Sequence, residues 1–176
     1  MGNENEVLRA IRERRSIRRF RADKLSEDDF NAILEAGTWA ASAKGQQSPV
    51  IVVVDDPADV EALRKANAEI WGRPDVDPFY GAPNIAVVLG DGDNPNWLQD
   101  GSLVMGNLML AAYAVGAGSC WINRAIEYFD RPDGKAMLEK WNLPAKYRGV
   151  AICALGYPMG DCPPPKARKE NYIIHA

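Results

Sequence analysis

The fold is decided by the stretch WLQDGSLVMGNLMLAAYAVGAGSCWI, residues 97–122. From Trp97 to Val115 the apolar residues fall on most faces of a helix, so we expect a long helix that is buried. The glycines at positions 116 and 118 then turn the chain into SCWI, an apolar segment with the character of a strand. A buried helix that leads directly into a strand indicates helices packed on a sheet, in an α+β or mixed α/β domain.

Other apolar runs are typical of strands of the same sheet. They are VIVVV (50–54), NIAVVLG (84–90) and GVAICALGY (149–157), and NYIIH (171–175) predicts a short last strand. The first three are short and apolar throughout, which indicates strands that are buried in the sheet. The sheet is therefore expected to lie at the centre of the molecule.

Helices are expected between these strands. Ser26 is placed to cap a helix that runs to about Thr38, because Asp28 and Asp29 follow in its first turn, where the helix dipole favours negative charge. Apolar spacing predicts three more helices, at about 7–14, 57–71 and 131–141. Since no repeat or long linker divides the chain, we expect a single domain over residues 1–176.

Composition excludes several classes of protein. The net charge of −3 argues against a nucleic-acid binder, and no apolar stretch is long enough to span a membrane. The three cysteines form no CxxC pair, which is typical of a reducing compartment. We therefore expect a soluble, cytoplasmic protein that binds neither nucleic acid nor membrane.

Two basic clusters stand at opposite ends of this acidic chain. Seven arginines lie between Arg9 and Arg21, around the motif RRSIRRF (14–20), and PPPKARK (163–169) places Lys166 and Arg168 on one face of an extended segment. Guanidinium groups match phosphate oxygens in pairs, so the two clusters together are suited to one phosphate. Each cluster taken alone is equally consistent with a solvated basic surface.

The remaining motifs supply binding groups rather than a catalytic set. ASAKGQQSP (41–49) has small residues that let backbone approach a ligand, although an ordinary helix-to-strand loop has the same composition. GAGSCWINR (116–124) lacks the third glycine of a dinucleotide fingerprint. The one histidine, His175, argues against a hydrolytic triad or a histidine metal site, and we expect no metal. This pattern is typical of a protein whose cofactor carries the reaction.

The order of these segments resembles the nitroreductase family of FMN-dependent NAD(P)H oxidoreductases. The resemblance rests on RRSIRRF, ILEAGTWAASAKGQQSP, YGAPNIAVV, DGSLVMGNLMLAAYAVGAGSCWI and GVAICALGYPMGDCPPPKARKE. It implies an α+β fold with a mostly antiparallel central sheet flanked by helices. It further implies an intertwined homodimer with flavin at the subunit interface, the helix at 103–115 in that interface, and exchange of the C-terminal strand 171–175.

The resemblance also implies which residues bind FMN. The first motif and the late Lys-x-Arg pair would hold the phosphate and ribityl chain, with Arg18 near the pyrimidine edge of the flavin. The loop before the first strand would lie along the ring, and the backbone near Asn123 and Arg124 would face N5. The expected cofactor-binding residues are Arg14, Arg15, Ser16, Arg18, Ser42, Lys44, Gln47, Ile122, Asn123, Lys166 and Arg168.

The activity implied is reduction of nitroaromatics, quinones or similar conjugated acceptors. NAD(P)H would give hydride to flavin N5, leave, and be replaced by the acceptor in a ping-pong mechanism, with no side chain acting as acid or base. Two positions depart from the family: Gly45 stands where Asn is common, and Ser48 where Pro is common.

Three alternatives stay open. The first is other flavin chemistry on the same fold, such as dehalogenation, enone reduction or breakdown of the flavin, with selectivity in the loop 72–83. The second is an FMN-binding sensor module without turnover. The third is a small nucleic-acid binder with a basic arm.

Overall fold

The computed structural model describes residues 5–176, and a four-stranded antiparallel sheet lies at its centre. The strand order is β1-β2-β4-β3, and every neighbouring pair is antiparallel. The strands are β1 (Val50–Val53), β2 (Asn84–Asp91), β3 (Gly118–Ile122) and β4 (Tyr147–Gly156). The predicted α+β fold with a mostly antiparallel central sheet is confirmed.

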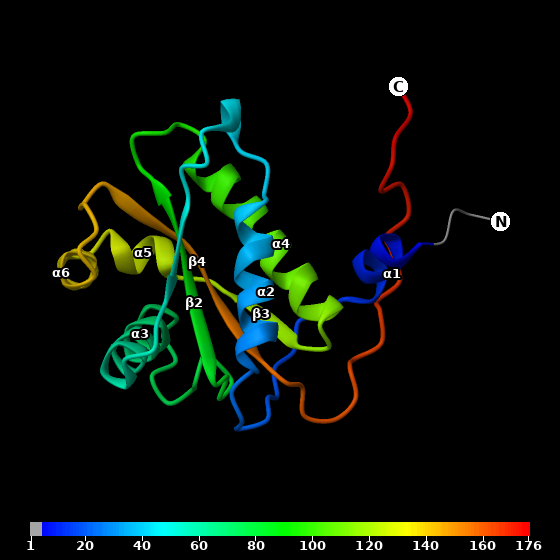
Figure 1. Ribbon diagram of the computed structural model, residues 1–176, viewed down its shortest axis with the longest axis horizontal. Coiled ribbons are helices and arrows are strands. Elements are labelled where there is room, and N and C mark those ends of the chain that lie inside the picture. Colours follow the sequence, from blue (N-terminus) through cyan, green and yellow to red (C-terminus); the bar gives the residue numbers. More distant parts are fainter. Residues whose placement is uncertain (1–4) are drawn as a thin grey trace.

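Helices cover both faces of this sheet (Figure 1). Two of them, α2 and α4, lie together on one face, and α5 lies on the other with α3 and α6 beside it. Along β4, Ile152 and Ala154 belong to the core on the α5 side, and Ala151, Cys153 and Leu155 to the core on the α4 side. The helices are α1 (Glu6–Glu13), α2 (Glu27–Thr38), α3 (Pro57–Ile70), α4 (Trp97–Ala114), α5 (Ala125–Phe129) and α6 (Pro132–Lys140), with a 3₁₀ turn at Ala43–Gly45.

The long helix α4 packs tightly against α2. A Cβ on Gly37 of α2 would come within 2.8 Å of Leu108 of α4, so the glycine permits this approach. Met105, Leu108 and Ala112 are fully buried. The predicted helix is buried on most sides, but Leu103 still exposes 50% of its surface in the single chain. One apolar side of α4 is therefore uncovered in the single chain.

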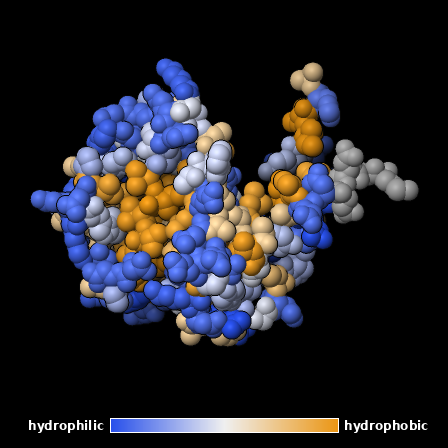
Figure 2. Space-filling view, viewed as in Figure 1, coloured by the Kyte–Doolittle hydropathy of each residue, from blue (hydrophilic) through white to orange (hydrophobic). Residues whose placement is uncertain are grey.

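The C-terminal segment forms no strand in the single chain, contrary to the expectation for residues 171–175. Residues 160–176 are all exposed, and among them Tyr172, Ile173 and Ile174 expose 69–81% of their surface. Figure 2 shows hydrophobic surface on a tail that stands away from the main body. A strand requires a hydrogen-bonding neighbour, and no strand of the described residues pairs with this segment.

Within residues 5–176, no helix is both long enough and apolar enough to cross a membrane.

Candidate functional site

The motif RRSIRRF lies along the outer edge of β3. Helix α1 ends at Arg14, where ψ changes to 134°, and the chain then runs extended. Ser16 forms an isolated parallel bridge with Ser119 of β3, and Ile17 N donates to Ser119 O at 2.9 Å. The buried side chain of Ile17 anchors the segment, so that the arginines on either side of it are held at the sheet edge.

Two guanidinium groups of this motif carry buried nitrogen atoms that have no hydrogen-bond partner among residues 5–176. Arg15 Nη1 donates to the carbonyl oxygens of Arg12 (2.7 Å) and Arg14 (2.6 Å), but its Nε is buried and unpaired. Arg14 Nη1 is likewise buried and unpaired. A buried cationic donor without an acceptor is costly, and an anionic ligand removes that cost. The residues present here therefore fit a phosphate group.

A cavity of about 230 Å³ brings Arg18 together with Ile122, Asn123 and Arg124. These four were predicted from two separate segments, and the structure places them on one cavity at the end of β3. Arg124 adopts a left-handed conformation (φ 77°) and its Nη1 lies 2.8 Å from Glu127 Oε1. The cavity is also lined by Asn67, Trp71 and Trp121, which were not among the expected cofactor-binding residues, and by Pro78 and Tyr80, which belong to the loop 72–83.

The loop around Ser42 is held by a buried carboxylate. Asp100, 3% exposed in the first turn of α4, accepts from Ala43 N at 2.9 Å and from Asn94 Nδ2 at 3.0 Å. Ser42 Oγ accepts from Gln47 N at 2.8 Å, which closes the turn. The 3₁₀ turn is thus fixed to the N-terminal end of α4.

This loop lies far from Ser16 within one chain. Ser119, the bridge partner of Ser16, lies in the same row across the sheet as Asn84 of β2. Val50, at the end of the loop, pairs with Leu89 of β2 and so lies in a second row, further along the strands. These rows are about 17 Å apart along the strands, and β1 and β3 are about 14 Å apart across the sheet. The single chain therefore does not bring Ser42, Lys44 and Gln47 to Ser16.

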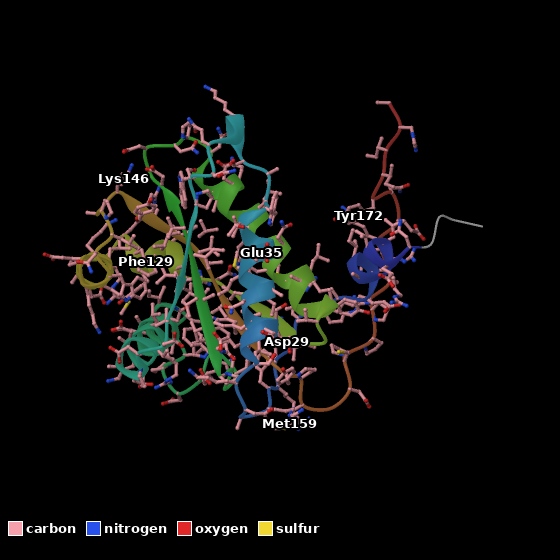
Figure 3. All side chains as sticks on the ribbon, viewed as in Figure 1. Asp29, Glu35, Phe129, Lys146, Met159 and Tyr172 are labelled. Carbon is pink, nitrogen blue, oxygen red and sulfur yellow. The ribbon has the colours of Figure 1, made fainter. Side chains whose placement is uncertain are left out.

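The late basic pair lies on the exposed tail. Arg168 Nη2 donates to Lys166 O at 2.9 Å, and both side chains face solvent. Within residues 5–176, no hydrogen bond or ion pair joins either residue to Arg14 or Ser16. The tail begins beside the motif, since a cavity of about 220 Å³ separates Ser16 from Pro163. It then runs up the same side of the molecule as α1, where Figure 3 shows Tyr172.

Backbone strain occurs at several of the predicted residues. Among residues 5–176, six residues that are not glycine have positive φ, and they are Lys44, Gln47, Tyr80, Arg124, Asn142 and Asn171. Such conformations cost about 1–3 kcal/mol each and are found preferentially where a ligand is bound. Three of the six, Lys44, Gln47 and Arg124, were predicted to lie near the cofactor, and Tyr80 lines the same cavity as Arg124.

The buried thiols are poor nucleophiles. Burial raises the pKa of Cys120, although the positive charges of Arg18 and Arg14 oppose the effect, and burial raises that of Cys153 to about 12. Both therefore act as small apolar core residues. In the part of the chain that is described, no three His, Cys, Asp or Glu side chains gather around a metal-sized space.

The sequence profile of the nitroreductase family matches residues 11–157. This chain belongs to the nitroreductase family. A protein of Archaeoglobus fulgidus described as "Putative NADH dehydrogenase/NAD(P)H nitroreductase" is 30% identical over 89% of this chain and 87% of its own length. The crystal structure of a Bacteroides fragilis nitroreductase with bound FMN, a member with 29% identity, superposes over 98% of this chain and 100% of the other with a TM-score of 0.89.

A second solved member gives the same agreement. The structure from Desulfovibrio desulfuricans, a nitroreductase described as being in complex with FMN, is 29% identical and covers 99% of this chain, with a TM-score of 0.75. Such agreement over nearly the whole chain confirms the family and shows that this nitroreductase is an enzyme.

Proposed function

We propose that this nitroreductase binds FMN and uses NAD(P)H to reduce nitroaromatics, quinones or similar conjugated acceptors by a ping-pong mechanism. The observation that carries the proposal is the pair of buried, unpaired guanidinium nitrogens of Arg14 and Arg15 beside Ser16. The two solved family members that contain FMN support the choice of cofactor.

The phosphate end of the site is built from cations. Arg14 and Arg15 would supply charge-assisted donors from the edge of β3, and the Ser16 hydroxyl a shorter neutral donor. Lys166 and Arg168 would close over the same phosphate when the tail is folded against the site. In this proposal, the tail supplies the part of the phosphate site that moves.

The ring end of the site is the cavity beside β3. FMN bound there would supply the hydride chemistry at its N5 atom, and the residues of this chain would bind and orient it. Arg18 would stabilise the negative charge that the reduced pyrimidine edge carries, because its guanidinium lies on the same cavity. The left-handed turn at Arg124 would present the backbone of Asn123 and Arg124 to the ring.

The site would be complete only in a homodimer. Ser42, Lys44 and Gln47 lie too far from Ser16 to reach the same cofactor from the same chain, so the partner's loop would supply them. The outer edge of β1 carries no paired strand among the described residues, and it is therefore available to residues 171–175 of a partner. The uncovered side of α4 around Leu103 would form the centre of the interface.

A spectroscopic experiment tests the enzyme. Purified protein should be yellow, and its visible absorbance should bleach when NADH or NADPH is added without oxygen. Addition of a nitroaromatic or a quinone should restore the colour. Colourless protein that does not take up FMN would refute the proposal, and bound FMN that neither nicotinamide bleaches would favour a sensor.

A surface substitution tests the dimer. Leu103→Glu places a charge on the uncovered side of α4 and should shift the protein from dimer to monomer in analytical ultracentrifugation. Lys65→Glu, on the exposed side of α3, is the matched control. A Leu103→Glu protein that remains dimeric would contradict the placement of the interface.

A further inference from the structure

The loop that carries Lys44 and Gln47 has a strained backbone. Lys44 (φ 56°), Gly45 (φ 64°) and Gln47 (φ 51°) all lie in the left-handed region, and two of the three are not glycine. Residues other than glycine keep such a conformation only where the surrounding structure holds them in it. Lys44 and Gln47 are both exposed, so burial of their own side chains does not hold them. Hydrogen bonds from neighbouring segments must therefore maintain the turn.

The side chain of Asn94 joins the far end of this loop to α4. Asn94 is 8% exposed, and its Nδ2 donates both to Ser48 Oγ at 2.8 Å and to Asp100 Oδ2 at 3.0 Å. The other carboxylate oxygen of Asp100 accepts from Ala43 N at 2.9 Å. Since Ala43 and Ser48 stand at the two ends of the turn, one buried amide and one buried carboxylate close it from both sides.

The orientation of the Asn94 amide follows from its contacts. Its Oδ1 accepts from the backbone N of Asn96 at 2.9 Å, so its nitrogen must face Ser48 and Asp100. Both N–H groups of the amide are then used, one on a hydroxyl and one on a carboxylate. A leucine at position 94 has a similar size but no donor, and it would leave the Asp100 carboxylate with one fewer hydrogen bond.

Ser48 is compatible with the turn in a way that proline is not. A proline moves the residue before it toward an extended backbone. The residue before position 48 is Gln47, whose left-handed backbone is held by a hydrogen bond from its N to Ser42 Oγ at 2.8 Å. Serine permits this conformation and also supplies the hydroxyl that Asn94 binds. The serine that replaces the common proline of the family therefore belongs to the same arrangement as Asn94.

We propose that Asn94 is a positioning residue for the cofactor. Through Ser48 and Asp100, it holds the loop in the conformation that presents Lys44 and Gln47 to the flavin of the partner protomer. The assignment rests on the proposed function, in which this loop completes the partner's site. Asn94 acts only through the loop, so its replacement lowers the fraction of time for which the site is complete, and the affinity falls by that fraction.

Binding of FMN to the dimeric apoprotein, followed by flavin fluorescence, tests the assignment. Asn94→Leu should bind FMN about tenfold more weakly, because the loop occupies its binding conformation for about a tenth of the time. Ser48→Ala should bind about threefold more weakly, and Ser48→Thr, which keeps the hydroxyl, within about twofold of wild type. Asn96→Leu is the matched control and should bind like wild type, because Asn96 is exposed and its side chain does not cap α4.

A second background separates positioning from a general loss of stability. In a protein that carries both Lys44→Ala and Gln47→Ala, the side chains that Asn94 positions are absent. The further substitution Asn94→Leu should then weaken FMN binding by less than about twofold. An undiminished tenfold loss in this background would overturn the positioning role. At saturating FMN, Asn94→Leu should also change the visible circular dichroism of the bound flavin, and an unchanged spectrum would overturn the role as well.

The variants at position 48 keep the test decisive if Asn94→Leu does not fold. Ser48→Pro should bind FMN more weakly than Ser48→Ala, because it removes the hydroxyl and also disfavours the backbone of Gln47. Wild-type affinity in Ser48→Pro, or equal affinities in Ser48→Ala and Ser48→Thr, would overturn the assignment. Wild-type protein that binds no FMN at all would instead refute the proposed function.

Discussion

Asp100→Asn should loosen the loop that contains Ser42 and Lys44. The carboxylate is 3% exposed and accepts two hydrogen bonds, one from Ala43 N and one from Asn94 Nδ2. An asparagine keeps one acceptor oxygen, but it presents an amide N–H to one of these donors. The substitution therefore removes one charge-assisted bond and weakens the other, at a cost of about 2–4 kcal/mol in the free energy of unfolding.

Urea unfolding of the apoprotein, followed by tryptophan fluorescence at fixed protein concentration, measures this cost. With a slope of about 2 kcal/mol per molar urea, the midpoint should fall by about 1–2 M. Asp93→Asn is the matched control, because Asp93 lies in the preceding turn with its side chain 75% exposed and should change stability by less than about 0.5 kcal/mol. Amide hydrogens of residues 42–48 should also exchange faster in Asp100→Asn. Equal midpoints for the two variants would refute the role of Asp100 as the anchor of this loop.

Three further predictions concern charges and thiols. Arg168→Ala should weaken FMN binding by about 1.5–3 kcal/mol through loss of a charge-assisted bond to the phosphate. An unchanged dissociation constant in a fluorescence titration would count against binding of the phosphate by the tail. Because burial raises the pKa of Cys153 to about 12, a thiol reagent at pH 8 should label the exposed Cys162 first and Cys153 only on unfolding; rapid labelling of both in folded protein would contradict this. The hydrogen bond from Lys146 lowers the pKa of Asp91 below its ordinary value. The stability that this bond contributes is therefore present at pH values above the ordinary aspartate pKa, and it is lost as pH falls through the folded-state pKa of Asp91. Lys146→Met should raise the Asp91 pKa in an NMR titration, and an unchanged pKa would exclude the pair.

The strands and most helices could be predicted because their signals are local. A few neighbouring residues are enough to predict the β-branched strand at 50–54 and the helix cap at Ser26. The structure has this cap, because Ser26 Oγ accepts from Asp29 N at 3.1 Å. Helix α5 escaped prediction because it has five residues and begins at Arg124, a left-handed residue without a side-chain cap. The last strand, 171–175, was predicted from its alternation, but a strand exists only where another chain segment pairs with it.

The candidate site was predictable only as a set of residues and not as an arrangement. Motif order named Arg14, Ser16 and Arg18, which the structure places along one sheet edge, and it also named Ser42 without any indication that this loop lies toward the other end of the sheet. That separation depends on strand register and order, which are properties of the whole sheet. The sequence pattern therefore names these residues together although the single chain holds Ser42 away from Ser16.

The burial of Asn67 could not have been predicted from the sequence, because it depends on how α3 is rotated against its neighbours. In the sequence Asn67 is one polar residue in an amphipathic helix. Its position depends on Asp59, two turns earlier in α3, which accepts from Lys140 Nζ at 2.5 Å and from Trp141 Nε1 at 2.9 Å and so fixes α3 against the end of α6. With the helix held in that rotation, Asn67 is buried on the cavity that Arg18 lines. A polar contact between α3 and the end of α6 thus determines which side chain of α3 lies on this cavity, and no local motif of the sequence contains that information.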